Sequence, residues 1–259
     1  MKVEEIMTKD VIKIDKDENL NHVLRLMKKH EITKIPVLDG KKLIGIITDN
    51  MIAYKLGSIR KKGIPPSRLH ASSVTERNVE RISLDTEVKE ILKDVGKPGP
   101  TMLCVMENDK LMGVVTKADL LPLVNSKKKL REIMNKKIHA VSPDDRVIHA
   151  RRIMIDENIA RLPVVDNGKM VGIISDNEIA FALAELKGSI PLGRQKHQLD
   201  ELLVRDAMRR PVFWTAPNMT AKDAATIMFK YNIGALPIIE NESITGIVTR
   251  TDLLKTISI

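Results

Sequence analysis

Apolar residues recur along the chain at helical spacing, and two short apolar runs follow each such stretch. In the first stretch, the positions i, i+3, i+4 and i+7 form one apolar face of a helix: Leu20, Val23, Leu24 and Met27. The runs 35–38 and 43–47 indicate strands, and the turn between them contains Gly40, which suits a tight reversal. The pattern therefore predicts a helix that is followed by a β-hairpin.

The same pattern returns further along the chain, at 88–95 and again at 221–228. A register of Met, Met, Pro and Gly with spacings of 20, 9 and 9 residues occurs in three copies: Met7, Met27, Pro36 and Gly45; Met134, Met154, Pro163 and Gly172; Met208, Met228, Pro237 and Gly246. The second copy keeps only Gly113 and has Thr75, Val95 and Cys104 at the other points. Such self-similarity indicates one small unit repeated four times.

Each copy ends in an octet in which an apolar strand runs directly into a helix start. The fourth copy has Gly246-Ile-Val-Thr-Arg-Thr-Asp-Leu253, the second has Gly113-Val-Val-Thr-Lys-Ala-Asp-Leu120, and looser versions stand at 45–52 and 172–179. Each copy thus predicts a β–α–β–β–α unit that is closed by a second helix. A unit of about 55 residues is small for independent folding, so we expect the units to pair.

The register, the strand Arg161-Leu-Pro-Val-Val-Asp166 and the octet together resemble the CBS domain. The resemblance covers residues 3–56, 74–124, 130–183 and 204–257, and it is weaker in the second copy. It implies an α/β (α+β) fold of four repeats that pair into two Bateman modules. The related stretches Gly57-Ser-Ile59 and Gly188-Ser-Ile190 favour pairing of copy one with two and of copy three with four. The composition further suggests an archaeal or thermophilic source.

These boundaries give a complete domain plan. The expected segments are repeat 1 (1–56), a basic linker (57–73), repeat 2 (74–126), repeat 3 (127–187), a basic linker (188–203) and repeat 4 (204–259), in modules 1–126 and 127–259. We expect the modules to stack within one chain or between two chains as a homodimer.

The resemblance implies that the octet binds an adenosine-type ligand. In the family the Asp accepts from the ribose hydroxyls, and the Ser or Thr contacts the phosphate. The corresponding residues here are Thr116 and Asp119, Ser175 and Glu178, and Thr249 and Asp252, whereas copy one has Met51 at the ribose position. Beside the hydroxyl, Lys117 and Arg250 would attract a phosphate, while Asp49 and Asp176 would repel it. Phosphorylated ligands should therefore occupy up to two sites, on copies two and four, with copy four preferred.

The same pairs have an alternative reading that needs no ligand. Ser or Thr followed three residues later by Asp or Glu fits a capping box, in which the two side chains satisfy the first N–H groups of a helix. A cap does not require Lys117 or Arg250, and their presence favours a ligand in copies two and four.

The family suggests two further groups of binding residues. Lys34 and Arg161 stand two residues before the strand Pro, where a basic side chain can reach a nucleotide phosphate; exposed strand-edge charges are the alternative. Thr215, Val212 and Leu236 fall where the family packs the base and ribose; core packing is the alternative and is the one we prefer for Val212.

The net charge of +9 allows two readings. Basic proteins attract nucleic acid, and the linkers contain Arg60, Lys61, Lys62, Arg194 and Lys196. Aromatic residues make up only 2% of the chain, however, so little is available to stack on bases. A solvated Lys/Glu surface of thermophilic type explains most of the charge, and we expect nucleic-acid binding to be weak.

Catalytic and metal-binding patterns do not stand out in the sequence. Cys104 lies in an apolar run and suits a buried strand, and the six histidines show no metal-ligand spacing. No apolar run approaches the length of a membrane span, and a single cysteine fits a reducing compartment, so we expect a cytoplasmic protein. The sequence predicts a regulatory sensor without catalytic activity or cofactor. Its ligand would be AMP, ADP or ATP, or alternatively S-adenosylmethionine or methylthioadenosine, and its protein partner is unknown.

Overall fold

The computed structural model describes residues 1–57, 64–95, 102–189 and 201–257. The chain folds into two compact units that do not follow the order of the sequence. Unit 2 contains residues 12–78 and 139–212, which are mainly copies one and three. Unit 1 contains residues 1–11, 79–138 and 213–259, which are mainly copies two and four. Whether copies one and two, and three and four, form the expected modules stays a prediction.

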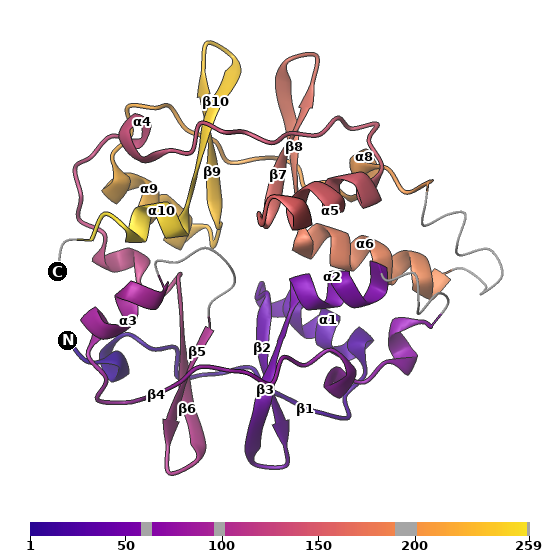
Figure 1. The fold of residues 1–259 in the computed structure, drawn as a ribbon, viewed down its shortest axis with the longest axis vertical. Helices are drawn as coiled ribbons and strands as arrows, with labels where there is room; N and C mark the ends of the chain where they lie inside the picture. Colours follow the sequence, from indigo (N-terminus) through magenta and orange to yellow (C-terminus); the bar gives the residue numbers. More distant parts are fainter. Residues whose placement is uncertain (58–63, 96–101, 190–200, 258–259) are drawn as a thin grey trace. The chain divides into compact units, whose positions relative to one another are not determined.

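Unit 2 is built from two helix–hairpin–helix motifs (Figure 1). Copy one supplies β1 (Ile14–Asp15), α1 (Leu20–His30), β2 (Lys34–Asp39), β3 (Lys42–Thr48) and α2 (Asp49–Gly57), and the linker after it supplies the short helices η3 (Pro66–Arg68) and η4 (Ala71–Ser73). Copy three supplies α5 (Val147–Asp156), β7 (Arg161–Asp166), β8 (Lys169–Ser175) and α6 (Asp176–Ser189), and the start of copy four adds α8 (Val204–Ala207). Helices α2 and α6 pack side by side, and one hydrophobic core contains residues of both copies.

Unit 1 repeats this arrangement with copies two and four. Copy two contributes β4 (Arg81–Ser83), α3 (Val88–Val95), β5 (Met102–Glu107), β6 (Lys110–Thr116) and η5 (Leu121–Leu123). Copy four contributes α9 (Ala221–Lys230), β9 (Ala235–Glu240), β10 (Ser243–Thr249) and α10 (Arg250–Leu254). The unit also includes η1 (Val3–Glu5) from the start of copy one and α4 (Leu130–Ile133) from the start of copy three. A second core joins the two copies.

The helices and hairpins form where the apolar pattern places them, and the predicted α/β repeat fold is confirmed. The apolar face of α1 is completely or almost completely buried: Leu20, Val23, Leu24 and Met27. Asn19 caps this helix by accepting from His22 N at 3.0 Å. The expected first strand shortens in copies three and four to the single bridges Val141–Val164 and Thr215–Ile238.

One expectation was wrong. We expected an α-helix after the octet of copy two, but the chain forms only the 3₁₀ helix η5 there. Pro122 stands within η5; it has no N–H to donate and it disfavours helical backbone in the residue before it.

The structure explains the repeated Met and Gly of the register. A side chain added to Gly113 would overlap Met7, and Gly246 and Gly172 meet Met134 and Met208 in the same way. Gly45 is crossed by the backbone of Glu76 and the side chain of Thr75. The segment that opens each copy therefore packs on the hairpin of the neighbouring copy in the sequence, where it forms the bridges Thr8–Val114, Glu76–Ile46, Asn135–Ile247 and Arg209–Ile173.

Replacing Gly45 by alanine should destabilise unit 2 by about 1–3 kcal/mol, because the added methyl group meets backbone atoms that cannot rotate away. Gly172→Ala should cost less, because its neighbour is the flexible thioether of Met208. Thermal unfolding of the unchanged protein, Gly45→Ala and Gly172→Ala measures the loss of stability in each variant.

Gly188 in α6 is the matched control within the same unit, since an added Cβ meets nothing within 4 Å. Gly188→Ala should be neutral or stabilising by up to about 1 kcal/mol, as expected for alanine in a helix. Equal loss at all three glycines would contradict the close-approach explanation.

Candidate functional site

In copies one, three and four, octet side chains cap the start of the helix that follows. In copy four, Asp252 Oδ2 accepts from Thr249 N at 2.9 Å and from Thr249 Oγ1 at 2.7 Å. In copy two, Asp119 Oδ2 accepts from Thr116 N and Oγ1, both at 2.7 Å. The capping-box reading is therefore correct for copy four. In copy two the same pair of residues closes a turn, and the 3₁₀ helix η5 begins only at Leu121, without a side-chain cap. In both pairs the N–H and the hydroxyl of the Thr donate to the same carboxylate oxygen.

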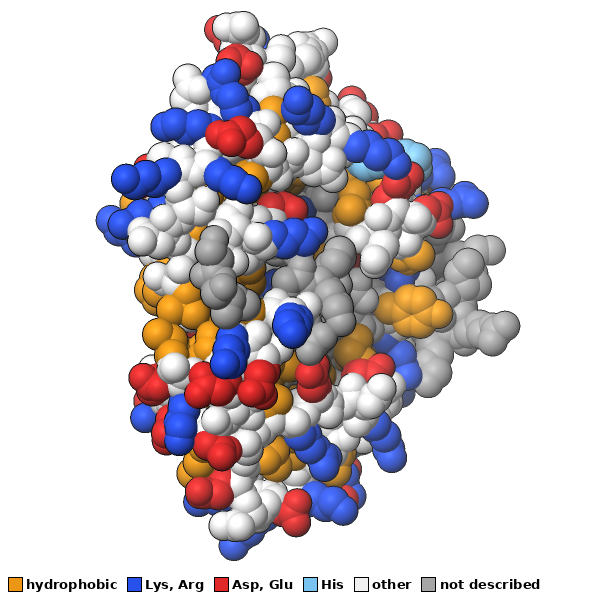
Figure 2. Space-filling view, turned by 60° about the vertical axis from the view of Figure 1, so that its left-hand side comes forward, with side chains coloured by type: hydrophobic (Ala, Val, Ile, Leu, Met, Phe, Trp, Pro, Cys, Tyr) orange, Lys and Arg blue, Asp and Glu red, His pale blue; other side chains and the backbone are white. Residues whose placement is uncertain are grey.

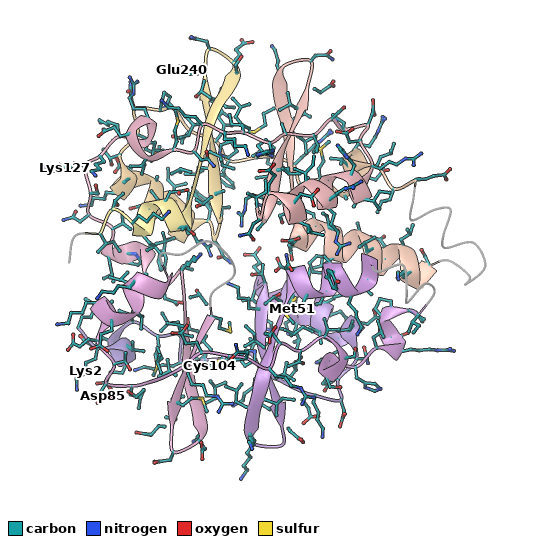
Figure 3. All side chains as sticks on the ribbon, viewed as in Figure 1. Lys2, Met51, Asp85, Cys104, Lys127 and Glu240 are labelled. Atoms are coloured by element: carbon teal, nitrogen blue, oxygen red, sulfur yellow. The ribbon has the colours of Figure 1, made fainter. Side chains whose placement is uncertain are left out.

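Copies one and three vary this cap. Glu178 Oε2 accepts from Ser175 N at 3.0 Å and also from the Ser175 hydroxyl. Met51, which lies at the start of α2 (Figure 3), cannot accept a hydrogen bond from Thr48; its own N–H donates to Thr48 Oγ1 at 3.2 Å. Copy one thus keeps a helix cap but has no carboxylate at the expected ribose position.

The register of each hairpin places one strand residue directly opposite the octet hydroxyl. The pairs are Lys34–Thr48, Met102–Thr116, Arg161–Ser175 and Ala235–Thr249. The residue after the hydroxyl is hydrogen-bonded to the residue that precedes the same strand. Asp49 N donates to Thr33 O at 3.0 Å, and Asp176 N donates to Ala160 O at 3.2 Å. In copies one and three, a basic strand residue therefore lies beside an acidic octet residue.

Charged side chains gather in unit 2 where α2 packs on α6. Asn50 Nδ2 of copy one donates to Asp176 Oδ2 of copy three at 3.0 Å. Burial and the nearby Asp176 raise the pKa of Asp49 to about 6, against the attraction of Lys34 and Arg161. Burial also raises the pKa of Asp176, while Asn50, Arg151 and Arg161 act in the opposite direction.

Arg161 is central to this cluster. Burial lowers the pKa of its guanidinium, and the attraction of Asp49, Glu178 and Asp176 opposes the shift. Lys34 and Arg161 are both partly buried and lie among carboxylates, so the alternative of fully exposed strand-edge charges does not describe them.

Two arginines line the edge of the same cluster. Arg209 approaches Glu178 at 4.0 Å. Arg151 of α5 lies over the Tyr54 ring at 5.5 Å and against Gly57, whose missing side chain makes room for it. Arg209 thus contacts copy three at Glu178, and Arg151 connects copy three with Tyr54 of copy one.

In unit 1, the two basic octet residues have partners of different kinds. Arg250 Nε donates to Ile233 O at 3.1 Å, and its second nitrogen donates to Asn232 Oδ1 at 2.9 Å, so Arg250 fastens the turn after α9. Lys117 is buried and reaches from copy two to copy four, where its Nζ donates to Thr251 Oγ1 at 2.9 Å. Burial lowers the pKa of Lys117 to about 8, although Asp252 attracts its charge.

The remaining predicted residues fall into different environments. Thr215 is buried beside β9, and its N–H donates to Pro237 O at 3.0 Å. Leu236 belongs to the core of unit 1, so core packing describes Leu236. Val212 is only partly buried, so the core packing that we preferred for it does not describe this residue well.

Three contributors were not anticipated: Thr8, Asn50 and Arg151. Thr8 Oγ1 donates to Asp119 Oδ1 at 2.8 Å, so both oxygens of Asp119 are hydrogen-bonded. Thr8 follows Met7 of the register, but the sequence does not reveal that Met7 packs on copy two. Asn50 and Arg151 act between copies one and three, a contact that the repeat pattern leaves open.

The other predictions concern chemistry outside the octets. Cys104 is fully buried on β5 (Figure 3), and burial raises the pKa of its thiol to about 11, so it is a strand residue and is protonated at neutral pH. Within the described residues, no group of three or more His, Cys, Asp or Glu could hold a metal, and no helix is long and apolar enough to cross a bilayer. The basic linker residues 60–62, 194 and 196 lie outside the described residues.

The face shown in Figure 2 carries lysine and arginine side chains interspersed with acidic ones. On this face, the mixture is typical of a solvated charged surface.

Comparison with known proteins decides the family. The CBS domain family model matches residues 3–58, 130–185 and 204–259, which is well over half of the chain. The chain belongs to the CBS domain family. The three matched stretches are copies one, three and four, in which the octet and the register are also clearest.

Two proteins of Methanocaldococcus jannaschii match the chain along its whole length. Protein MJ1404 of Methanocaldococcus jannaschii is 28% identical over 99% of this chain, which spans 62% of the length of that relative. The crystal structure of protein MJ1225 from the same organism, proposed to be an archaeal homologue of g-AMPK, superposes with a TM-score of 0.83 at 22% identity and covers 100% of both chains. The latter likeness confirms the fold.

Enzymes also contain similar CBS repeats. The inosine-5'-monophosphate dehydrogenase of Korarchaeum cryptofilum is 31% identical over 49% of this chain, but the match covers only 24% of that enzyme and is confined to its CBS region. The similarity therefore concerns the CBS repeats and not the dehydrogenase.

Replacing Asp49 by asparagine should stabilise unit 2 at neutral pH. Because its pKa is raised from 3.8 to about 6 in the folded protein, the ionised carboxylate opposes folding above pH 6. At about 1.4 kcal/mol per pKa unit, the gain should be on the order of 2–3 kcal/mol. It should shrink as the pH falls and vanish below about pH 4, where the carboxyl is neutral in both states. Thermal unfolding from pH 3.5 to 8 measures this dependence.

Asp166, which is exposed at the end of β7, is the control for this experiment. Asp166→Asn should change stability by no more than about 0.5 kcal/mol at any pH. A similar gain in both variants, or no gain for Asp49→Asn at pH 8, would contradict the assignment.

Proposed function

We propose that the protein is a regulatory sensor of adenosine-type ligands and that copy four carries its principal binding residues. The observation that supports this best lies in unit 1. Around the start of α10, the carboxylate of Asp252, the hydroxyls of Thr249 and Thr251 and the buried ammonium of Lys117 come together. A carboxylate suits ribose hydroxyls, and an ammonium beside hydroxyls suits a phosphate.

The cap and the binding role of Asp252 are compatible. The cap engages Oδ2, and a carboxylate has acceptor sites on both oxygens. Asp119 differs, because a ribose hydroxyl in copy two would compete with Thr8 for Oδ1. This difference supports the preference for copy four over copy two.

Regulation would follow from differential binding. A ligand that favours one arrangement of the paired repeats shifts the population toward it, and a partner protein reads that change. AMP, ADP and ATP are the first candidates, and S-adenosylmethionine and methylthioadenosine form the alternative class because they present the same adenosyl group. The likeness to protein MJ1225, which is proposed to be an archaeal homologue of g-AMPK, supports a regulatory role over a catalytic one.

A second function, nucleic-acid binding through the basic linkers, stays a weaker alternative. Aromatic residues make up only 2% of the chain, so few side chains are available to stack on bases. Such binding should weaken steeply with salt, because every neutralised phosphate releases counterions.

Thermal unfolding in the presence of AMP, ADP, ATP, S-adenosylmethionine and methylthioadenosine tests the proposal. A binding ligand should stabilise the protein by about 2.7 kcal/mol at a hundredfold excess over its Kd. Asp252→Ala should abolish the response of the copy-four site, because it removes the ribose acceptor. Absence of any response at millimolar concentrations would refute the ligand class.

Asp223 provides a matched control in the same copy. Thr220 and Asp223 form a cap of the same kind at the start of α9, with Thr220 Oγ1 donating to Asp223 Oδ2 at 2.6 Å. Asp223→Ala and Asp252→Ala should each cost about 1 kcal/mol of stability, but only the latter should lose the ligand response. Loss of the response in both variants would show that the cap alone matters.

A further inference from the structure

Two positions of each copy carry different patterns of charge in the two units: the strand residue opposite the octet hydroxyl, and the octet residue after that hydroxyl. In unit 2 the strand residue is basic and the octet residue is acidic: Lys34 with Asp49, and Arg161 with Asp176. In unit 1 the strand residue is uncharged and the octet residue is basic: Met102 with Lys117, and Ala235 with Arg250. The pairs in unit 2 are therefore electrically neutral, whereas those in unit 1 are positive.

The acidic residues of unit 2 are placed to engage the basic ones. Asp49 is attracted by both Lys34 and Arg161, and Asp176 is attracted by Arg161 and Arg151. Asn50 holds the Asp176 carboxylate at 3.0 Å, across the contact of α2 with α6. Each of Lys34 and Arg161 therefore has at least one of these carboxylates near enough to offset its charge, and an anion that approached either cation would also meet that carboxylate.

We propose that Asp49 and Asp176 are specificity-determining residues, which act as internal counter-ions of Lys34 and Arg161 and exclude phosphorylated ligands from copies one and three. The proposal rests on the function proposed above and assigns the ligand class of unit 2. A phosphate would be repelled by the carboxylates of Asp49 and Asp176 and by that of Glu178. The charge of Arg161, which could attract the phosphate, is already offset by these three carboxylates. An uncharged or cationic adenosyl ligand meets no such repulsion, and Glu178 supplies a carboxylate for its ribose.

The decisive experiment removes the two negative charges and measures pyrophosphate binding by isothermal titration. Asparagine keeps an oxygen that can accept from Asn50, so the packing is preserved. Asp49→Asn/Asp176→Asn should bind pyrophosphate at least tenfold more tightly than the unchanged protein. Adding Arg161→Gln to this pair should remove the gain, because it deletes a freed cation.

The matched control makes the same change in net charge elsewhere in unit 2. Asp39 and Asp166 occupy equivalent positions at the ends of β2 and β7 and are both exposed. Asp39→Asn/Asp166→Asn should leave the affinity for pyrophosphate within twofold of the original. An equal gain in this control, or no gain in Asp49→Asn/Asp176→Asn, would overturn the proposal.

Acidification offers an independent test on the unchanged protein. Protonation of Asp49 should imitate its replacement, so sulfate, whose charge is constant between pH 5 and 7.5, should bind more tightly at pH 5. The groups that face Asp49 and Asp176 are Lys34, Arg161, Arg151, Glu178 and Asn50, with Arg209 beside Glu178. The increase should be much smaller in Asp49→Asn/Asp176→Asn; an increase of the same size there would count against the proposal.

Folding and the broader function are controlled separately. If the double variant does not unfold cooperatively, Asp49→Asn alone replaces it, since that change is expected to stabilise unit 2. Pyrophosphate and sulfate contain no adenosyl group, so their binding tests the counter-ions even if every adenosyl ligand fails. Conversely, adenosyl binding without the pyrophosphate gain would retain the sensor and refute the counter-ion role.

Discussion

The fold depends on the close approach of two chain segments at four glycines. At Gly45, Gly113, Gly172 and Gly246, the segment that opens another copy crosses the hairpin where a side chain would stand. A Cβ at these positions cannot be accommodated without movement of the crossing segment, and this is why the Gly is the one register point kept in all four copies. The crossing also adds bridges to the hairpin, such as Thr8–Val114 and Asn135–Ile247, so it fixes the position of the strand that leads into each octet.

The fixed strand in turn determines what surrounds each octet. Because the hairpin register sets Lys34 against Thr48 and Arg161 against Ser175, a basic strand residue lies next to the residue after the hydroxyl in copies one and three. The two acidic octet residues and the two basic strand residues are therefore one electrostatic unit. The stability of such a buried cluster depends on its neighbouring charges, because a carboxylate removed from water must regain the lost solvation energy from nearby cations and hydrogen-bond donors. Asp49 is compensated only in part, as its raised pKa shows.

Much of this could be predicted from the sequence, because the relevant signals are local. The helix faces, the hairpins and the capping pair Thr249–Asp252 follow from spacings of three to nine residues. The partner of each register methionine could not be predicted, because Met7 could equally have packed on Gly45 of its own copy. The direction of Lys117 was also hidden: a long side chain beside Thr116 reaches Thr251, 134 residues away, and no local pattern encodes that contact. The missing helix of copy two was a misjudged local signal, since Pro122 was visible.

The caps explain why the residues that we propose for ligand binding also have a structural role. A Thr or Ser followed by an acidic residue three positions later stabilises a helix start without any ligand, so these residues suit folding alone. In the function that we propose, ligand binding then depends on which acceptor oxygens the cap does not use. Asp252 gives one oxygen to its cap, Asp119 gives both oxygens to Thr116 and Thr8, and Met51 gives none. Octets of related sequence can thus differ in binding, because neighbouring segments form hydrogen bonds or ion pairs with different atoms of each octet.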